Sequence, residues 1–187
     1  MIDTSEFKNG TFLYVDGKLY KIIWFQHHKP GKGGAIMRTK LKDVIGGATV
    51  EKTFRAGEKF ETPEMSRRPC SFLYETGATL VFMDLQDYEQ NEINKGTAGI
   101  AEKFLTENMR VLIVKADGRV IDVELPVSVE MEIEYTEPGA KGDTVSNVMK
   151  TARLKNGVEI KVPLFVGTGD VVKIDTRTGK YLEKGHK

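Results

Sequence analysis

A lysine flanked by glycines is the residue best suited to do chemistry. Lys32 lies in the segment Lys29-Pro30-Gly31-Lys32-Gly33-Gly34, between two runs of apolar and aromatic residues. Pro30 stiffens the approach to the lysine, and the glycines remove side chains on both sides of it. The lysine ammonium is a compact charge on a long stem. We therefore predict a projecting tip that can carry a positive charge into a narrow, negatively charged space.

Two nucleotide-binding motifs are similar to this segment but do not fit it. A phosphate-binding P-loop needs Ser or Thr after its lysine and then a helix, whereas Gly33 and a predicted strand follow Lys32. A dinucleotide fingerprint opens a helix, and no helix is predicted here. A plain glycine-rich hairpin loop remains the alternative.

The tip lies within a stretch that lacks acidic residues. The basic residues of this stretch repel one another unless a polyanion is near. The stretch is therefore either a solvated basic face or a surface that binds a polyanion. Between Asp16 and Asp43 the basic residues are Lys18, Lys21, Lys29, Lys32, Arg38, Lys40 and Lys42.

The composition is that of a globular protein. The 187 residues are 40% hydrophobic and 29% charged, and no run approaches the ~18 apolar residues of a membrane span. The N-terminus lacks the pattern of a secretory signal. The single cysteine, Cys70, forms no internal disulfide. We expect a cytoplasmic protein with no membrane segment.

The histidines and the cysteine are not expected to form a metal site or to supply a nucleophile. His27 and His28 lack a third ligand at suitable spacing and are expected to be surface residues at a strand end. His186 is expected in a frayed terminus. Cys70 has no obvious base partner and is expected to be a packed small residue.

The remaining candidates are also expected to be structural. Asp84, Asp87 and Glu89 are interpreted as a solvated turn and not as an acid–base pair. Trp24 is expected in the core, with a platform for stacking an RNA base as the alternative. We thus predict no catalytic residue, no metal and no cofactor, and hence no enzyme.

Short strands separated by turns predict an all-β chain. The first third indicates a meander of four or five strands, the size of an SH3-like barrel. Its expected strands are 11–15, 19–25, 35–41 and 48–54, with turns at Asp16-Gly17 and Gly46-Gly47.

The middle third begins with an expected linker, Glu61 to Pro69. Asp84 to Gln90 is predicted to form one helical turn, and Thr97–Leu105 is the best short helix. The expected strands here are 71–74, 79–83, 109–115 and 119–124.

The last third has the clearest alternation. Residues 127–135 alternate apolar and polar side chains without interruption, which predicts a strand with one buried face. Asn156-Gly157 is a strong hairpin signal. Further strands are expected at 158–162, 171–175 and 180–182.

We predict three small domains, over residues 1–64, 65–127 and 128–187. Their net charges are +3, −3 and +1, from basic and acidic counts of 11 and 8, 7 and 10, and 10 and 9. Each would bury only a modest core and be about 25 Å across. In tandem they would form a rod or an L.

The whole chain resembles bacterial elongation factor P. The tip Lys29-Pro30-Gly31-Lys32-Gly33 is similar to the modified loop of that family. Further matching stretches are Val50–Phe54, Gly57-Glu58-Lys59, Phe82-Met83-Asp84, Tyr88-Glu89-Gln90, Lys141–Thr144, Lys150–Gly169 with its spaced Ala152, Gly157, Ile160, Val162-Pro163 and Val166, and Asp175–Gly179 with Tyr181.

This resemblance implies a fold and a function. The fold would be an SH3-like (KOW-like) first domain and two OB-fold barrels, in an elongated L shape resembling tRNA. The protein would be a monomer that binds the 70S ribosome between the P and E sites and relieves stalling at consecutive prolines. Lys32, extended by a lysine-modifying enzyme, would reach the acceptor end of the P-site peptidyl-tRNA.

The resemblance also implies RNA contacts outside the tip. Gly142, Asp143 and Thr144 would form a loop near the E-site messenger RNA, although this chain has Ser146-Asn147-Val148-Met149 in place of the usual glycine-rich run and Thr151 where proline is common. Lys184 stands where arginine is often found. The residues expected to contact tRNA or rRNA are Lys18, Lys21, Arg38, Lys40, Lys42 and Tyr181.

Two alternatives stay open at this point. One is a paralogue of elongation factor P with a different client. The other is a structural RNA-binding β-barrel protein of the ribosome with no functional tip. An enzyme is a third possibility that no group of residues supports, and the hypusine-bearing factor of eukaryotes and archaea is disfavoured because this chain continues through a third barrel.

Overall fold

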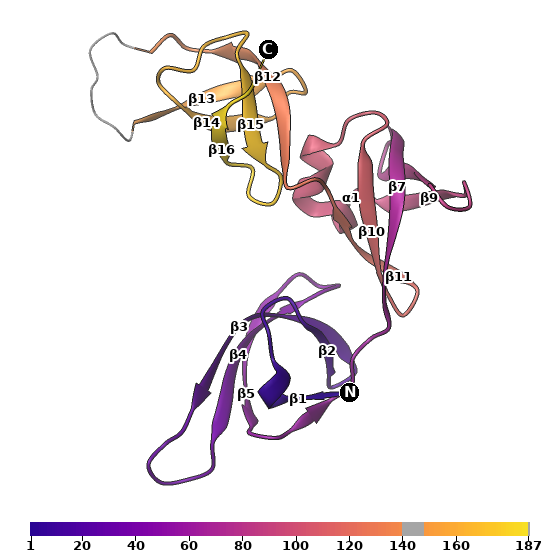
Figure 1. Ribbon diagram of the computed structural model, residues 1–187, viewed down its shortest axis with the longest axis vertical. Helices are drawn as coiled ribbons and strands as arrows, with labels where there is room; N and C mark the ends of the chain where they lie inside the picture. The colour runs from indigo at the N-terminus through magenta and orange to yellow at the C-terminus, as the bar shows by residue number, and fades with distance from the viewer. Residues whose placement is uncertain (140–147, 187) are drawn as a thin grey trace. The chain divides into compact units, whose positions relative to one another are not determined.

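A computed structural model describes residues 1–139 and 148–186 of the chain. These residues form sixteen strands and three short helical segments, which confirms the all-β prediction. None of these helical segments has the length or the apolar character to span a membrane. The chain divides into two compact units, the first of Met1–Ser66 with Lys115–Ile121 and the second of Arg67–Val114 with Asp122–Lys187 (Figure 1). The domain boundaries after residues 64 and 127 stay predictions.

The first unit is built around an antiparallel meander of four strands in the order β2-β3-β4-β5. The short strands β1 and β6 pair with each other, Ile2 opposite Phe60. Its elements are β1 (Ile2–Asp3), the 3₁₀ turn η1 (Thr4–Glu6), β2 (Phe12–Val15), β3 (Lys18–His28), β4 (Ile36–Asp43), β5 (Thr49–Arg55) and β6 (Lys59–Phe60).

Alternating apolar residues give this sheet one buried face. Leu13, Ile22 and Leu41, from three adjacent strands, are fully buried. The Phe54 and Phe60 rings close the core with centroids 4.7 Å apart. The turn between β2 and β3 has Asp16 and Gly17 both at positive φ, 51° and 76°. This is the geometry that an Asp-Gly hairpin predicts, because such turns match the twist of the strands.

A β-bulge interrupts the β3–β4 ladder. Ile22 lies opposite Leu41, but the next paired residue on β3 is Trp24, opposite Lys40. Ile23 is therefore the extra residue. Since a bulge adds one residue to one strand, it resets which side chains point outward beyond it.

The second unit holds two five-stranded sheets, in the orders β11-β10-β7-β8-β9 and β14-β13-β12-β15-β16. Its elements are β7 (Met65–Thr76), β8 (Thr79–Asp84), β9 (Gln90–Asn94), α1 (Lys95–Ala98), η2 (Gly99–Phe104), β10 (Arg110–Ala116), β11 (Arg119–Glu124), β12 (Ser128–Thr136), β13 (Met149–Leu154), β14 (Glu159–Pro163), β15 (Val171–Asp175) and β16 (Tyr181–Lys184).

One sequence-based boundary in the middle of the chain is wrong. The expected linker, Glu61 to Pro69, is in part strand, because β7 begins at Met65. The single helical turn predicted within 84–90 is confirmed, since the Tyr88 N–H donates to the Asp84 carbonyl at 2.9 Å, and Tyr88 ends the turn with a φ of 63°. The helical prediction at 97–105 is confirmed in α1 and η2.

The C-terminal sheet also departs from simple alternation. A bulge lies between Ile133 and Tyr135 on β12. Beyond it Thr136 is buried and Tyr135 is exposed, although the sequence pattern predicts the opposite. Phe104 of η2 packs into the same core as Ile133 and Leu154. The helical segment and the C-terminal strands of this unit therefore share one core.

Candidate nucleic-acid interface

The Lys32 tip is the loop between β3 and β4. These strands form a hairpin that extends beyond the rest of the first unit (Figure 1). Residues 29–35 connect His28 to Ile36, and Lys32 is exposed. Within the described residues, the Lys32 side chain makes no hydrogen bond or ion pair. The ammonium is therefore not tied to its own barrel.

At only one of the tip positions does the backbone conformation require a glycine. Gly33 has a φ of 120°, a region that side chains rarely adopt. A Cβ at Gly31 or Gly34 would meet no atom within 4 Å. Gly33 therefore shapes the turn, whereas the other two glycines keep the surroundings of Lys32 free of side chains.

The outward side of β4 is a basic surface. Arg38, Lys40 and Lys42 are exposed and alternate with buried Met37, Thr39 and Leu41. Lys21 on β3 lies directly opposite Lys42. We call Lys21, Arg38, Lys40 and Lys42 the basic face. Strand period and register thus bring together four of the five lysine and arginine residues predicted to contact RNA on this domain.

Acidic residues neutralise little of this face. Glu51 on β5 lies opposite Lys40, with 3.4 Å between Nζ and Oε1. Both side chains are well exposed, and such pairs contribute little stability. Charge on the face therefore remains available to an anionic partner.

Trp24 lies on the outward side of the sheet, and its predicted place in the core is wrong. Its side chain is 39% exposed, and the adjacent Ile23 is 41% exposed. The bulge at Ile23 accounts for this, because it places Trp24 opposite Lys40. The Lys40 Nζ lies 5.9 Å from the centroid of the indole ring. The sequence favours the core for Trp24 because a bulge leaves no mark in apolar periodicity.

Lys18 lies apart from the basic face. It begins β3 next to the Asp16-Gly17 turn, opposite buried Val15. Its charge also helps to lower the pKa of Asp43, after the hydrogen bonds that this carboxylate accepts from the Gly46 and Ile45 N–H groups. The RNA contact predicted for Lys18 stays a prediction.

The remaining predicted RNA contacts are in the C-terminal part of the chain. Tyr181 is half-buried against the core of the second unit, and burial raises the pKa of its hydroxyl. Lys184 pairs with Asp170, with Nζ–Oδ2 at 2.9 Å. Gly142, Asp143 and Thr144 lie outside the described residues, so their proposed mRNA contact stays a prediction.

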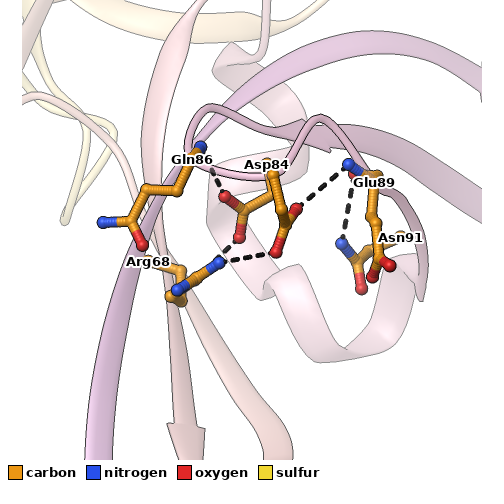
Figure 2. Close-up of polar contacts among 6 residues, drawn as sticks. Arg68, Asp84, Gln86, Glu89 and Asn91 are labelled. Carbon is orange, nitrogen blue, oxygen red and sulfur yellow. Dashed lines mark hydrogen bonds and ion pairs between the residues drawn. The ribbon is translucent and has the colours of Figure 1, made fainter.

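The acidic turn after β8 is solvated as expected except at Asp84, the last residue of that strand. Figure 2 shows Arg68 directed toward the Asp84 carboxylate, which accepts its Nε–H at 2.8 Å. Asp84 is 5% exposed. A second nitrogen of Arg68 donates to Asp87 at 2.8 Å. The Arg68 hydrogen bond, followed by the Gln86 N–H, holds the pKa of Asp84 below its ordinary value. This cluster joins β7 to the β8–β9 turn and is structural.

The other residues judged structural occupy the expected places. His27 and His28 are exposed at the end of β3, and Cys70 is 2% exposed. In residues 1–139 and 148–186, no group of three His, Cys, Asp or Glu side chains could hold a metal ion.

Comparisons with known proteins cover all three parts of the chain. Family models described as the elongation factor P KOW-like domain, its OB domain and its C-terminal domain match residues 3–60, 65–123 and 129–184. Elongation factor P of Mycobacterium avium (strain 104) is 50% identical over 97% of this chain and 97% of its own. The same factor of Corynebacterium aurimucosum is 51% identical over 98% of each chain.

A solved structure supports the same fold. A eukaryotic translation initiation factor 5A from Methanococcus jannaschii aligns with a TM-score of 0.51 at 27% identity, over 65% of this chain and 94% of that one. The likeness extends over about two thirds of this chain.

Proposed function

Since the chain belongs to the elongation factor P family, we propose that it promotes peptide-bond formation on ribosomes stalled at consecutive prolines. Family membership makes the chain a translation elongation factor and not an enzyme. In the proposed mechanism it binds the 70S ribosome as a cytoplasmic monomer, between the P and E sites. It contacts rRNA, the P-site tRNA and, through residues 142–144, the E-site mRNA.

The exposed Lys32 ammonium is the observation that carries this proposal. A cation at the end of a hairpin, with no Cβ on the neighbouring residues 31, 33 and 34, fits a confined and electronegative space. In the proposed role it orders the acceptor end of the peptidyl-tRNA. Orientation alone lowers a barrier by up to ~7–11 kcal/mol in the best intramolecular models, so the factor needs no acid or base of its own.

The basic face supports the tip by binding phosphates. Arg38, Lys40 and Lys42 project from the strand that leads back from the Lys32 loop. Contacts to phosphate fix position and orientation without reading sequence. We propose that this face holds the hairpin on tRNA or rRNA while Lys32 acts at its end.

Replacing Lys32 tests this function. We expect Lys32→Ala to keep its Tm, since exposed substitutions change stability by less than ~0.5 kcal/mol. We also expect it to lose relief of a polyproline pause in reconstituted translation. Lys8→Ala, at another exposed lysine of the first unit, should retain full relief. Normal relief by Lys32→Ala would refute the role assigned to the tip.

The proposal includes a modification of Lys32. A lysine-modifying enzyme would lengthen the side chain and carry its charge further from the loop. Intact-mass measurement of the native protein, with peptide mapping across residues 29–34, should show a mass increase located on Lys32. An unmodified Lys32 in protein that relieves pausing fully would remove the modifying enzyme from the mechanism.

A further inference from the structure

We propose that Trp24 and Lys40 form a platform that stacks an unpaired RNA base while holding its phosphate. This inference rests on the proposed function, because that function makes RNA the ligand of this domain. It adds a contact made by an aromatic ring on the side of the β3–β4 hairpin, at a distance from the tip loop.

The bulge gives Trp24 a position that core packing does not explain. The core of the first unit contains Leu13, Ile22 and Leu41 among others, and Trp24 is not a member of it. Trp24 is 39% exposed, so part of a large aromatic residue stays in water. Because the extra residue, Ile23, turns Trp24 outward, the strand presents this ring at the cost of regular pairing.

The immediate neighbours of the ring have the chemistry of a nucleotide site. Lys40 lies across the strand pair with its ammonium 5.9 Å from the ring centroid. Lys21 and Lys42, themselves directly opposite each other, form the next row of the ladder. Rows of outward side chains on one strand are ~7 Å apart, so cations flank the ring within reach of the phosphates of a stacked nucleotide.

An RNA base fits this arrangement better than an acidic peptide. A carboxylate-rich peptide would pair with the cations but would not need an exposed indole ring. Every base has a π-face, and aromatic side chains among cations are the usual platform for single-stranded nucleic acid. A duplex would engage the cations while its bases stayed stacked on one another. Dependence on Trp24 therefore distinguishes an unpaired base from both other ligands.

The intrinsic fluorescence of the protein gives a direct test, because Trp24 is the only tryptophan in the chain. We expect a single-stranded oligoadenylate to quench Trp24 emission in a saturable way at low salt. Polyglutamate should not quench it, and the corresponding RNA duplex should quench it weakly. Binding of the single strand without quenching, or equal quenching by polyglutamate, would overturn the proposal.

Variants separate stacking from charge. We expect Trp24→Leu to weaken oligoadenylate binding by roughly 5- to 150-fold, the range for one base–aromatic stack, without changing the salt dependence. Lys40→Met should instead reduce the slope of log affinity against log salt by about 0.7. Trp24→Phe should restore part of the affinity. Tyr135→Leu, at another exposed aromatic residue on a strand, should bind as wild type.

The outcome of the Trp24 binding experiments does not depend on the outcome of the pause-relief experiment with Lys32→Ala. Lys32→Ala should retain quenching at Trp24 even where it fails to relieve pausing. If Trp24→Leu binds RNA as wild type while Lys32→Ala loses pause relief, the platform is wrong and the proposed function stands. If Lys32→Ala relieves pausing normally, the role assigned to the Lys32 tip fails, whatever the fluorescence shows. An altered Tm of Trp24→Leu would leave the quenching of the wild type as the deciding measurement.

Discussion

At the scale of single residues, Arg68 shows how a polar contact can be mistaken for solvated charge. Asp84, Asp87 and Glu89 look alike in the sequence, but only Asp84 is buried. Its partner lies sixteen residues earlier, on the neighbouring strand. No local pattern predicts such a pair, because its members meet only through the register of β7 with β8.

This cluster predicts a pH-dependent contribution to stability. The folded pKa of Asp84 lies below its ordinary value of 3.8, chiefly because of the Arg68 hydrogen bond. A carboxylate that binds protons more weakly when folded stabilises the protein above that ordinary value. The contribution is lost as pH falls through the lowered folded pKa.

We expect Asp84→Asn to lower the free energy of unfolding in urea at pH 7. The difference from wild type should shrink as pH falls below 3.8. Asp87→Asn is the matched control, because its carboxylate contacts the same arginine but is 47% exposed. It should cost clearly less. Equal costs for the two variants would mean that burial of Asp84 does not determine its contribution.

At the scale of elements, strands and hairpins could be predicted from the sequence, but bulges could not. The meander of the first unit and the hairpins at Asp16-Gly17 and Asn156-Gly157 agree with the structure, because turn chemistry and period two are local properties. The bulges at Ile23 and near Tyr135 insert one residue into otherwise regular patterns. That is why both Trp24 and Tyr135 were predicted on the wrong face.

Two adjacent isoleucines on β3 test this account of the bulge. Ile22 is fully buried, whereas Ile23 is 41% exposed. We expect Ile22→Ala to reduce the free energy of unfolding by ~2–5 kcal/mol, the usual cost of a cavity in a core. Ile23→Ala should cost less than about 1 kcal/mol. Denaturant unfolding of both variants gives the comparison, and similar losses would contradict the described register.

At the scale of the whole molecule, a segment from the middle of the sequence joins the first unit. Residues 115–121, between and within the expected strands 109–115 and 119–124, belong to the first unit. The Asp117 carboxylate accepts hydrogen bonds from the Tyr14 hydroxyl and from the Glu64 N–H. Tyr14 is 103 residues away in sequence, so the pattern around Asp117 gives no sign of it.

Asp117 should therefore act as a link within the first unit. We expect Tyr14→Phe and Asp117→Asn each to lower the Tm and to increase hydrogen exchange at residues 115–121. The double variant should lose less stability than the sum of the losses in the two single variants, because each change removes the same hydrogen bond. Additive effects in this double-mutant cycle would show that the contact contributes no coupling.

Burial of Cys70 has a practical consequence for following the tip. The chain has one native thiol, and it is 2% exposed. A cysteine introduced in place of Lys32 would be the accessible site for a maleimide dye. Such a probe would report the distance from the hairpin end to a labelled tRNA by energy transfer. The native cysteine would not need to be removed first.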